Sequence, residues 1–142
     1  MSKIFFFLFL FIVINLSAAK QKMWDFQYSF NLKKDKIATV FIDKDSAGKG
    51  KSRYVLSFRW TLYDGSKNLI LLTKYMGYPN QYILSMKRSL DRVKVRLLQD
   101  GGDYREAAYA LIVFSNFELK KRVATLDVYI KDETKKVQVV FK

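Results

Sequence analysis

The chain has 142 residues, of which 26 are Lys or Arg and 13 are Asp or Glu, so its formal net charge is +13. It contains no cysteine and no histidine, which excludes a Ser-His-Asp triad, a thiolate nucleophile and the usual ligand sets of zinc, haem and iron–sulfur sites. Half of the residues are hydrophobic, so the chain is not a disordered basic tail, and its length fits one domain. We therefore expect a folded protein with no catalytic residues, no metal and no cofactor.

Residues 1–19 have the three parts of an export signal. Lys3 provides a positive charge, an unbroken apolar run covers residues 4–14, and Ser-Ala-Ala at residues 17–19 supplies the small side chains that a signal peptidase requires. A helix that crosses a bilayer needs ~20 apolar residues, whereas this run has 11. We expect cleavage after Ala19, which leaves residues 20–142 as a single domain in the soluble periplasm, with no transmembrane segment.

The chain after this signal alternates between apolar and polar residues, which is typical of half-buried β-strands. The first strand is expected over Trp24–Leu32, the second over Ile37–Ile42 and the third over Tyr54–Leu62. Every second residue of the first and third strands would then face the core: Trp24, Phe26, Tyr28, Phe30 and Leu32, and Tyr54, Leu56, Phe58, Trp60 and Leu62.

Turn signals separate the strands that follow. Asp64-Gly65 predicts a tight turn before a strand over Leu69–Met76, and the segment at residues 77–80, which holds the only proline, predicts the next turn. Residues 103–110 fit both a short helical turn and a strand. Further strands are expected over Gln81–Lys87, Leu90–Leu98 and Tyr109–Phe114, followed by a final hairpin of Lys121–Lys131 and Lys135–Phe141. A total of about nine short strands with frequent turns predicts an all-β fold, a single antiparallel β-sandwich.

Two loop motifs resemble ligand sites but lack the residues that those sites need. The segment at residues 43–48 resembles a calcium loop, yet Ala47 stands at a ligand position and Tyr54 stands where a bidentate glutamate should close the site. The Gly-Lys-Ser at residues 50–52 matches the end of a phosphate-binding loop, but a strand follows it where that loop requires a helix. We interpret both segments as solvated loops.

The carboxylates do not predict an enzyme. Most of them lie at predicted turns, where acids usually cap the backbone. Asp127 is within a predicted strand, facing away from Val128 and Ile130, and is expected to pair with a neighbouring Lys or Arg. A carboxylate-based hydrolase is an alternative that would require two acids at glycosidase spacing in one cleft.

A row of basic residues is the strongest functional signal. In the strand over Leu90–Leu98, Val93, Val95 and Leu97 should face the core while the intervening cations project outward. The alternative interpretation is that the cations only keep the protein soluble and protect an exposed strand. Export would separate the protein from the nucleic acid of the cytosol. The expected partner is therefore an envelope protein assembly or an anionic envelope surface. The candidate residues for such a partner are Arg59, Lys87, Arg88, Arg92, Lys94 and Arg96.

Aromatic residues give a second signal. Tyrosines near predicted turns, beside arginine, are typical of protein–protein hot spots, and this chain has Tyr63, Tyr75, Tyr78 and Tyr104 in such places. The first strand of the mature chain is also a candidate edge strand that could pair with a strand of a partner. The residues that would take part in this pairing are Trp24, Phe26 and Tyr28.

These observations predict a non-enzymatic, exported binding or scaffold protein. It would dock onto a larger cell-envelope assembly, such as a flagellar motor or a secretion apparatus, through its basic face and by edge-strand pairing. The alternative is a binder of an anionic lipid or another amphiphile, whose phosphate would meet Arg92, Lys94 and Arg96. No oligomeric state is predicted.

The export signal gives the first testable prediction. If residues 1–19 are removed by a signal peptidase, the secreted protein begins at Lys20, and amino-terminal sequencing of the periplasmic fraction should read Lys-Gln-Lys-Met-Trp. Recovery of the intact chain from the cytosol would contradict this prediction.

Overall fold

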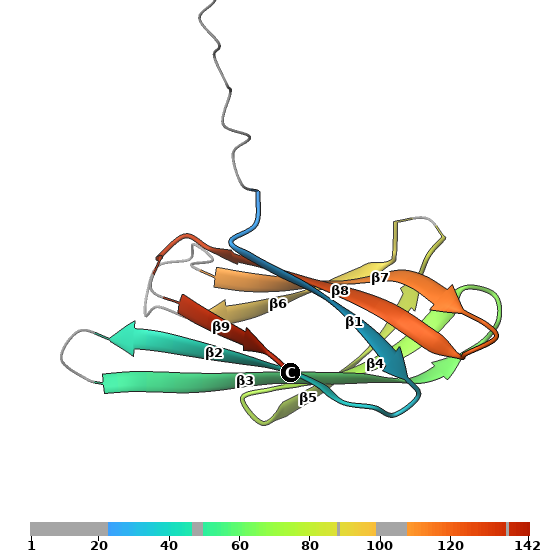
Figure 1. Ribbon diagram of the computed structural model, residues 1–142, viewed down its shortest axis with the longest axis horizontal. Coiled ribbons are helices and arrows are strands. Elements are labelled where there is room, and N and C mark those ends of the chain that lie inside the picture. The colour runs from blue at the N-terminus through green and yellow to red at the C-terminus, as the bar shows by residue number, and fades with distance from the viewer. Residues whose placement is uncertain (1–22, 47–49, 88, 99–107, 136) are drawn as a thin grey trace, which may run out of the picture.

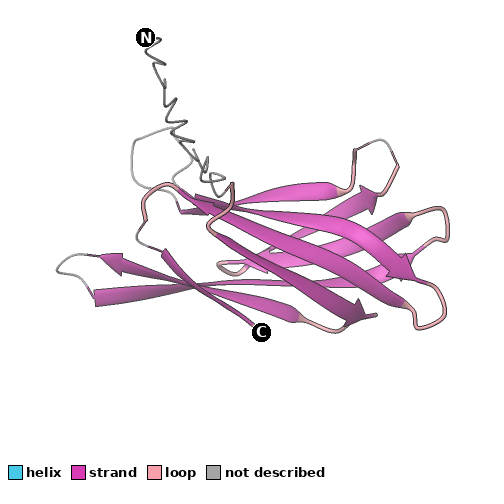
Figure 2. Cartoon of the chain, turned by 45° about the horizontal axis from the view of Figure 1, so that its top comes forward, coloured by secondary structure: helices cyan, strands magenta, loops and turns pink. Residues whose placement is uncertain are grey.

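The computed structural model describes residues 23–46, 50–87, 89–98, 108–135 and 137–142. Strands and their connecting turns make up these residues, as Figure 2 shows, and none of them is helical. These ranges therefore contain no helix that is long and apolar enough to cross a membrane. The strands are β1 (Phe26–Lys33), β2 (Ala38–Ser46), β3 (Gly50–Tyr63), β4 (Asn68–Tyr75), β5 (Tyr78–Ser85), β6 (Arg92–Leu98), β7 (Ala108–Glu118), β8 (Val123–Asp132) and β9 (Val137–Phe141).

The nine strands form two antiparallel sheets that lie face to face (Figure 1). The four-stranded sheet has the order β1-β8-β7-β6, and the five-stranded sheet has the order β5-β4-β3-β2-β9. The predicted fold class, an antiparallel β-sandwich of about nine strands, is confirmed. The segment at residues 103–110, which fitted both a helical turn and a strand, is strand at residues 108–110, where β7 begins, and its residues 103–107 lie outside the described residues.

The predicted final hairpin is wrong. β8 pairs with β1 and β7, whereas β9 pairs with β2 in the other sheet, so the connection crosses between the layers. The buried Asp132 carboxylate shapes this crossing, because it accepts hydrogen bonds from the backbone N–H groups of Thr134 and Val137 and from the Thr134 hydroxyl. A polar turn between two alternating segments predicts two strands, but it does not determine whether they pair with each other.

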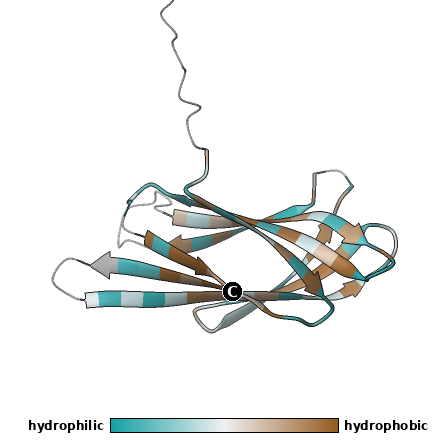
Figure 3. Cartoon of the chain, viewed as in Figure 1, coloured by the Kyte–Doolittle hydropathy of each residue, from teal (hydrophilic) through white to brown (hydrophobic). Residues whose placement is uncertain are grey.

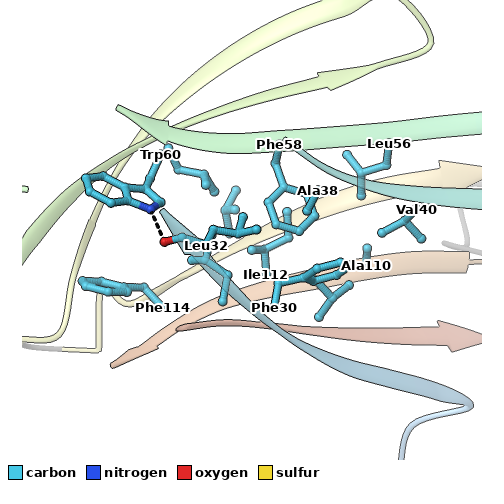
Figure 4. Close-up of a cluster of buried hydrophobic side chains, with 14 of the residues drawn as sticks. Phe30, Leu32, Ala38, Val40, Leu56, Phe58, Trp60, Ala110, Ile112 and Phe114 are labelled. Carbon is cyan, nitrogen blue, oxygen red and sulfur yellow. Dashed lines mark hydrogen bonds between the residues drawn. The ribbon is translucent and has the colours of Figure 1, made fainter. Parts of the chain in front are cut away.

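The core lies between the inner faces of the two sheets, where the buried side chains meet (Figure 4). Buried and more exposed residues alternate along the strands as the sequence predicts, and Figure 3 colours the strands by the hydropathy of these residues. Trp60, in the middle of the five-stranded sheet, is fully buried. Its indole Nε1 donates a 2.8 Å hydrogen bond to the carbonyl oxygen of Leu32 on β1, so this polar contact joins the two sheets (Figure 4). Phe30 and Phe58 meet edge to face beside it, with ring centroids 5.4 Å apart.

Two details of the predicted faces are wrong, and both follow from local backbone geometry. A β-bulge between Trp60 and Leu62 shifts the register of β3 against β4, so Leu62 is 50% exposed and Tyr63 turns inward instead. Tyr63 then stacks on Phe117 of β7 at 3.8 Å between ring centroids. At the other end of the chain, Trp24 precedes β1 and does not belong to its inner face.

The predicted turn around the proline is also displaced. Tyr75 and Tyr78 are paired across a two-residue turn, so the turn residues are Met76 and Gly77, with φ values of 50° and 84°. Positive φ at both positions is the geometry of a tight hairpin turn that fits the twist of its strands. Pro79 is therefore inside β5, which tolerates a proline because β5 is at the edge of its sheet.

The position of Trp60 leads to a stability prediction. Trp60→Ala should lower the free energy of unfolding by ~3–5 kcal/mol, because it leaves a cavity in the core and removes the hydrogen bond to Leu32. Leu62→Ala, two residues further along the same strand, should change it by less than about 0.5 kcal/mol because Leu62 is exposed. Urea unfolding of both variants measures the difference, and equal losses would contradict the bulge.

Candidate functional site

The basic row of the sequence lies on β6, the edge strand of the four-stranded sheet. Val93 and Leu97 are buried and Val95 is partly buried, so the predicted inward face of this strand is confirmed. The three cations that alternate with them point to the outer face of the sheet and are exposed. We call Arg92, Lys94 and Arg96 the basic row.

Neighbouring side chains position the cations of the basic row. The Arg92 guanidinium binds the Asp91 carboxylate through two hydrogen bonds of 2.8 and 3.2 Å, which hold the pKa of Asp91 below its usual value. The Lys94 ammonium lies 4.1 Å from the centroid of the Tyr109 ring on β7, a cation–π contact. Two of the three cations of the basic row, Arg92 and Lys94, therefore have defined orientations on the sheet.

The other predicted cations do not join this row. Lys87 is exposed in the connection between β5 and β6, where its backbone N–H donates to the Ser85 hydroxyl. Arg88 lies outside the described residues. Arg59 is on the outer face of the five-stranded sheet, beside Leu72 and Lys74, and this face points away from the basic row.

A cleft of about 560 Å³ opens between β6 and the facing part of the five-stranded sheet. Its walls are mainly aromatic and cationic, and the described lining residues include no carboxylate. We call it the tyrosine cleft; its lining consists of Lys44, Tyr54, Tyr75, Met76, Tyr78, Asn80, Tyr82 and residues 94–97 of β6.

Tyr75 connects the tyrosine cleft to the edge strand. Its hydroxyl donates a hydrogen bond to the carbonyl oxygen of Leu97, so the end of β4 is joined to β6 across the gap between the sheets. Burial, with a smaller effect of the neighbouring Tyr54, raises the pKa of the Tyr75 hydroxyl above its usual value. The phenol consequently stays protonated and remains a hydrogen-bond donor at physiological pH.

The tyrosines that were predicted near turns lie in different parts of the structure. Tyr75 and Tyr78 line the tyrosine cleft, Tyr63 stacks in the core near the other end of β3, and Tyr104 lies outside the described residues. Sequence analysis missed Tyr82 as a lining residue and assigned Tyr54 to the core, because both follow the inward alternation of their strands. Only the facing of β3 and β5 against β6 distinguishes these positions from ordinary core positions.

The candidate residues for edge-strand pairing are divided between two surfaces. β1 is at an edge of its sheet, where Phe26 is partly buried and Tyr28 is 50% exposed and stacks on Phe141 of β9 at 5.2 Å. Trp24 instead packs on the outer face of the sheet, with its ring centroid 5.3 Å from Tyr129 and 6.0 Å from Tyr109. Since Lys94 covers the ring of Tyr109, Trp24 belongs to the surroundings of the basic row.

Asp25 anchors the segment of the chain that precedes β1. Its carboxylate accepts a 2.7 Å hydrogen bond from the Lys135 ammonium and a 2.8 Å bond from the backbone N–H of Asp132, and Lys131 lies 3.9 Å away. The bond from Lys135, followed in size by the bond from Asp132, lowers the pKa of Asp25. The segment before β1 is thus fixed to the connection between β8 and β9.

Two further described acids have local partners. Asp127 was expected to pair with Lys or Arg, but it accepts hydrogen bonds of 2.5 and 2.6 Å from the hydroxyls of Ser29 and Ser115 on the flanking strands. Asp43, at the start of the calcium-like segment, forms a bidentate ion pair with Arg53 across the β2–β3 hairpin. Within the part of the chain that the structure describes, no group of three or more acids is placed to hold a metal ion.

Comparison with known proteins adds no relative: the chain matches no protein-family model, no curated protein and no solved structure.

The Asp25 contacts predict a pH-dependent contribution to stability. Because the pKa of Asp25 is lower in the folded chain than in the unfolded one, its ionised form stabilises the fold above about pH 4, and the contribution is lost as the pH falls through the folded-state pKa. Asp25→Asn should therefore be less stable than the original protein at pH 7, with a smaller difference at pH 3. Urea unfolding at both pH values measures this, and an equal difference would show that the ionised carboxylate is not responsible.

Proposed function

We propose that this protein is a non-enzymatic binding module, exported to the cell envelope, that docks onto an acidic partner through the edge of its sandwich formed by β6. The observation that carries the proposal is that two candidate binding surfaces lie on the same strand. The basic row projects from the outer face of β6, and the tyrosine cleft opens on the inner side of the same strand.

The composition of this edge supports a protein partner. Tyrosine, methionine and arginine are enriched in protein interfaces, and tyrosine and arginine dominate their energetic hot spots. The net charge of +13 favours encounter with an acidic surface. Since Arg92 and Lys94 are already positioned by Asp91 and Tyr109, less side-chain entropy is lost when a partner binds them.

A binding role also fits the way in which the described carboxylates are used. Asp64 accepts hydrogen bonds from the backbone of Ser66 and from the backbone and side chain of Asn68, which caps the turn between β3 and β4. Asp43 and Asp91 are engaged by arginines. In this proposal the edge of β1 provides a second contact, by pairing with a strand of the host assembly.

The second candidate function is binding of an anionic lipid or another amphiphile, and the tyrosine cleft is the observation that favours it. The space between the sheets is filled by large side chains such as Trp60, Phe58 and Phe114, each at most 1% exposed. An amphiphile would therefore lie at the surface of the sandwich, where the tyrosine cleft offers about 560 Å³. Lipid that co-purifies with the protein, identified by mass spectrometry, would support this function over docking.

Charge reversal of the basic row tests the docking proposal. Arg92→Glu with Arg96→Glu should abolish salt-sensitive retention of acidic envelope proteins on the immobilised protein, while the circular dichroism spectrum stays that of a β protein. The matched control is Lys34→Glu with Lys36→Glu, which makes the same change of charge in the exposed turn after β1, at the opposite edge of the sheet. Equal retention by both double variants, measured by quantitative mass spectrometry, would contradict the proposal.

A further inference from the structure

The tyrosine cleft lies between two sheet edges. Among the described strands, β5 pairs only with β4 and β6 pairs only with β7, and both contribute lining residues. Edge strands are the elements on which extended peptides add to a protein. A ligand that follows the tyrosine cleft would therefore run along these two edges.

The wall formed by β5 has the repeat of an extended chain. Tyr78, Asn80 and Tyr82 are alternate residues of β5, so they lie on one side of the strand and all line the tyrosine cleft. Alternate side chains of a strand are separated by ~6.6 Å. An extended peptide presents its own side chains at the same interval, so that successive side chains can meet successive positions of this wall.

The charge of the tyrosine cleft selects an acidic ligand. Lys44 from β2 lines it on one side, and the other side is the edge of β6, which carries Lys94 and Arg96 with their side chains toward the outer face of the sheet. Tyrosine rings between these cations can accept apolar or aromatic side chains, while the tyrosine hydroxyls and the amide of Asn80 can bind polar groups. The combination fits a peptide in which carboxylates alternate with apolar residues.

We propose that the tyrosine cleft binds an extended acidic segment of a partner protein, about four to six residues long. The inference rests on the proposed docking function and names the part of the partner that is recognised. The basic row attracts the acidic segment to the edge of the sandwich, and the residues of the tyrosine cleft contact its side chains.

The probe is a displayed library of ten-residue peptides in which Asp or Glu alternates with any other residue. Enriched peptides are synthesised with a fluorescein label, and their affinity for the purified protein is measured by fluorescence anisotropy. Tyr78→Ser, at a lining residue that is 75% exposed, should weaken binding at least tenfold, as expected for a hot-spot tyrosine. Ile83→Ser is the matched control, because Ile83 is 67% exposed on the opposite face of the same strand, and it should change affinity by less than about twofold.

Three results would overturn the inference. One is a library without enriched peptides, and another is equal binding by Tyr78→Ser and Ile83→Ser. The third is binding of vesicles containing phosphatidylglycerol, or of oligogalacturonate, that is lost in Tyr78→Ser and that the enriched peptides do not displace. If the peptides bind equally to the original protein and to Tyr78→Ser, and lose affinity only in Arg92→Glu, which lies outside the cleft lining, the tyrosine cleft is not the site, while the proposed docking through the basic row still holds.

Discussion

Alternate burial of side chains between two sheets is the constraint on which both the stability and the surface of this protein depend. Because residues two apart on a strand share a face, the alternation that buries Val93 and Leu97 also projects Arg92, Lys94 and Arg96 outward in one row. The chain has no cysteine, so no disulfide supports this arrangement. Stability then comes from the core and from contacts between the sheets, such as the hydrogen bond from Trp60 to the Leu32 carbonyl.

The tyrosine cleft forms where the two sheets are joined only partly. Near the end of β4 the hydroxyl of Tyr75 reaches the carbonyl of Leu97, whereas the flanking tyrosines line open space. The same phenol therefore joins the two sheets and lines the candidate site. This combination explains how a compact sandwich can present a hollow edge while Phe58 and Trp60 remain fully packed in its centre.

The sequence was sufficient to predict features that depend on period-two alternation, and insufficient for those that depend on pairing between distant segments. The directions of the side chains at residues 92–97 of β6 followed from alternation alone. The predicted inward position of Leu62 was wrong because of a one-residue bulge, which moves each later side chain to the other face. The place of β9 depends on how Asp132 shapes a turn, and the tyrosine cleft depends on five strands of two sheets, so neither has a local signature.

The two tryptophans occupy very different surroundings. Trp60 is sealed in the centre of the core, whereas Trp24 lies on the outer face, in contact with Tyr109, whose ring carries the ammonium of Lys94. Indole emission responds to solvent and to nearby charge, so the protein carries two natural optical reporters with separate duties. The fluorescence of Trp60 should report unfolding of the whole molecule. The fluorescence of Trp24 should report binding near the basic row, without any attached dye.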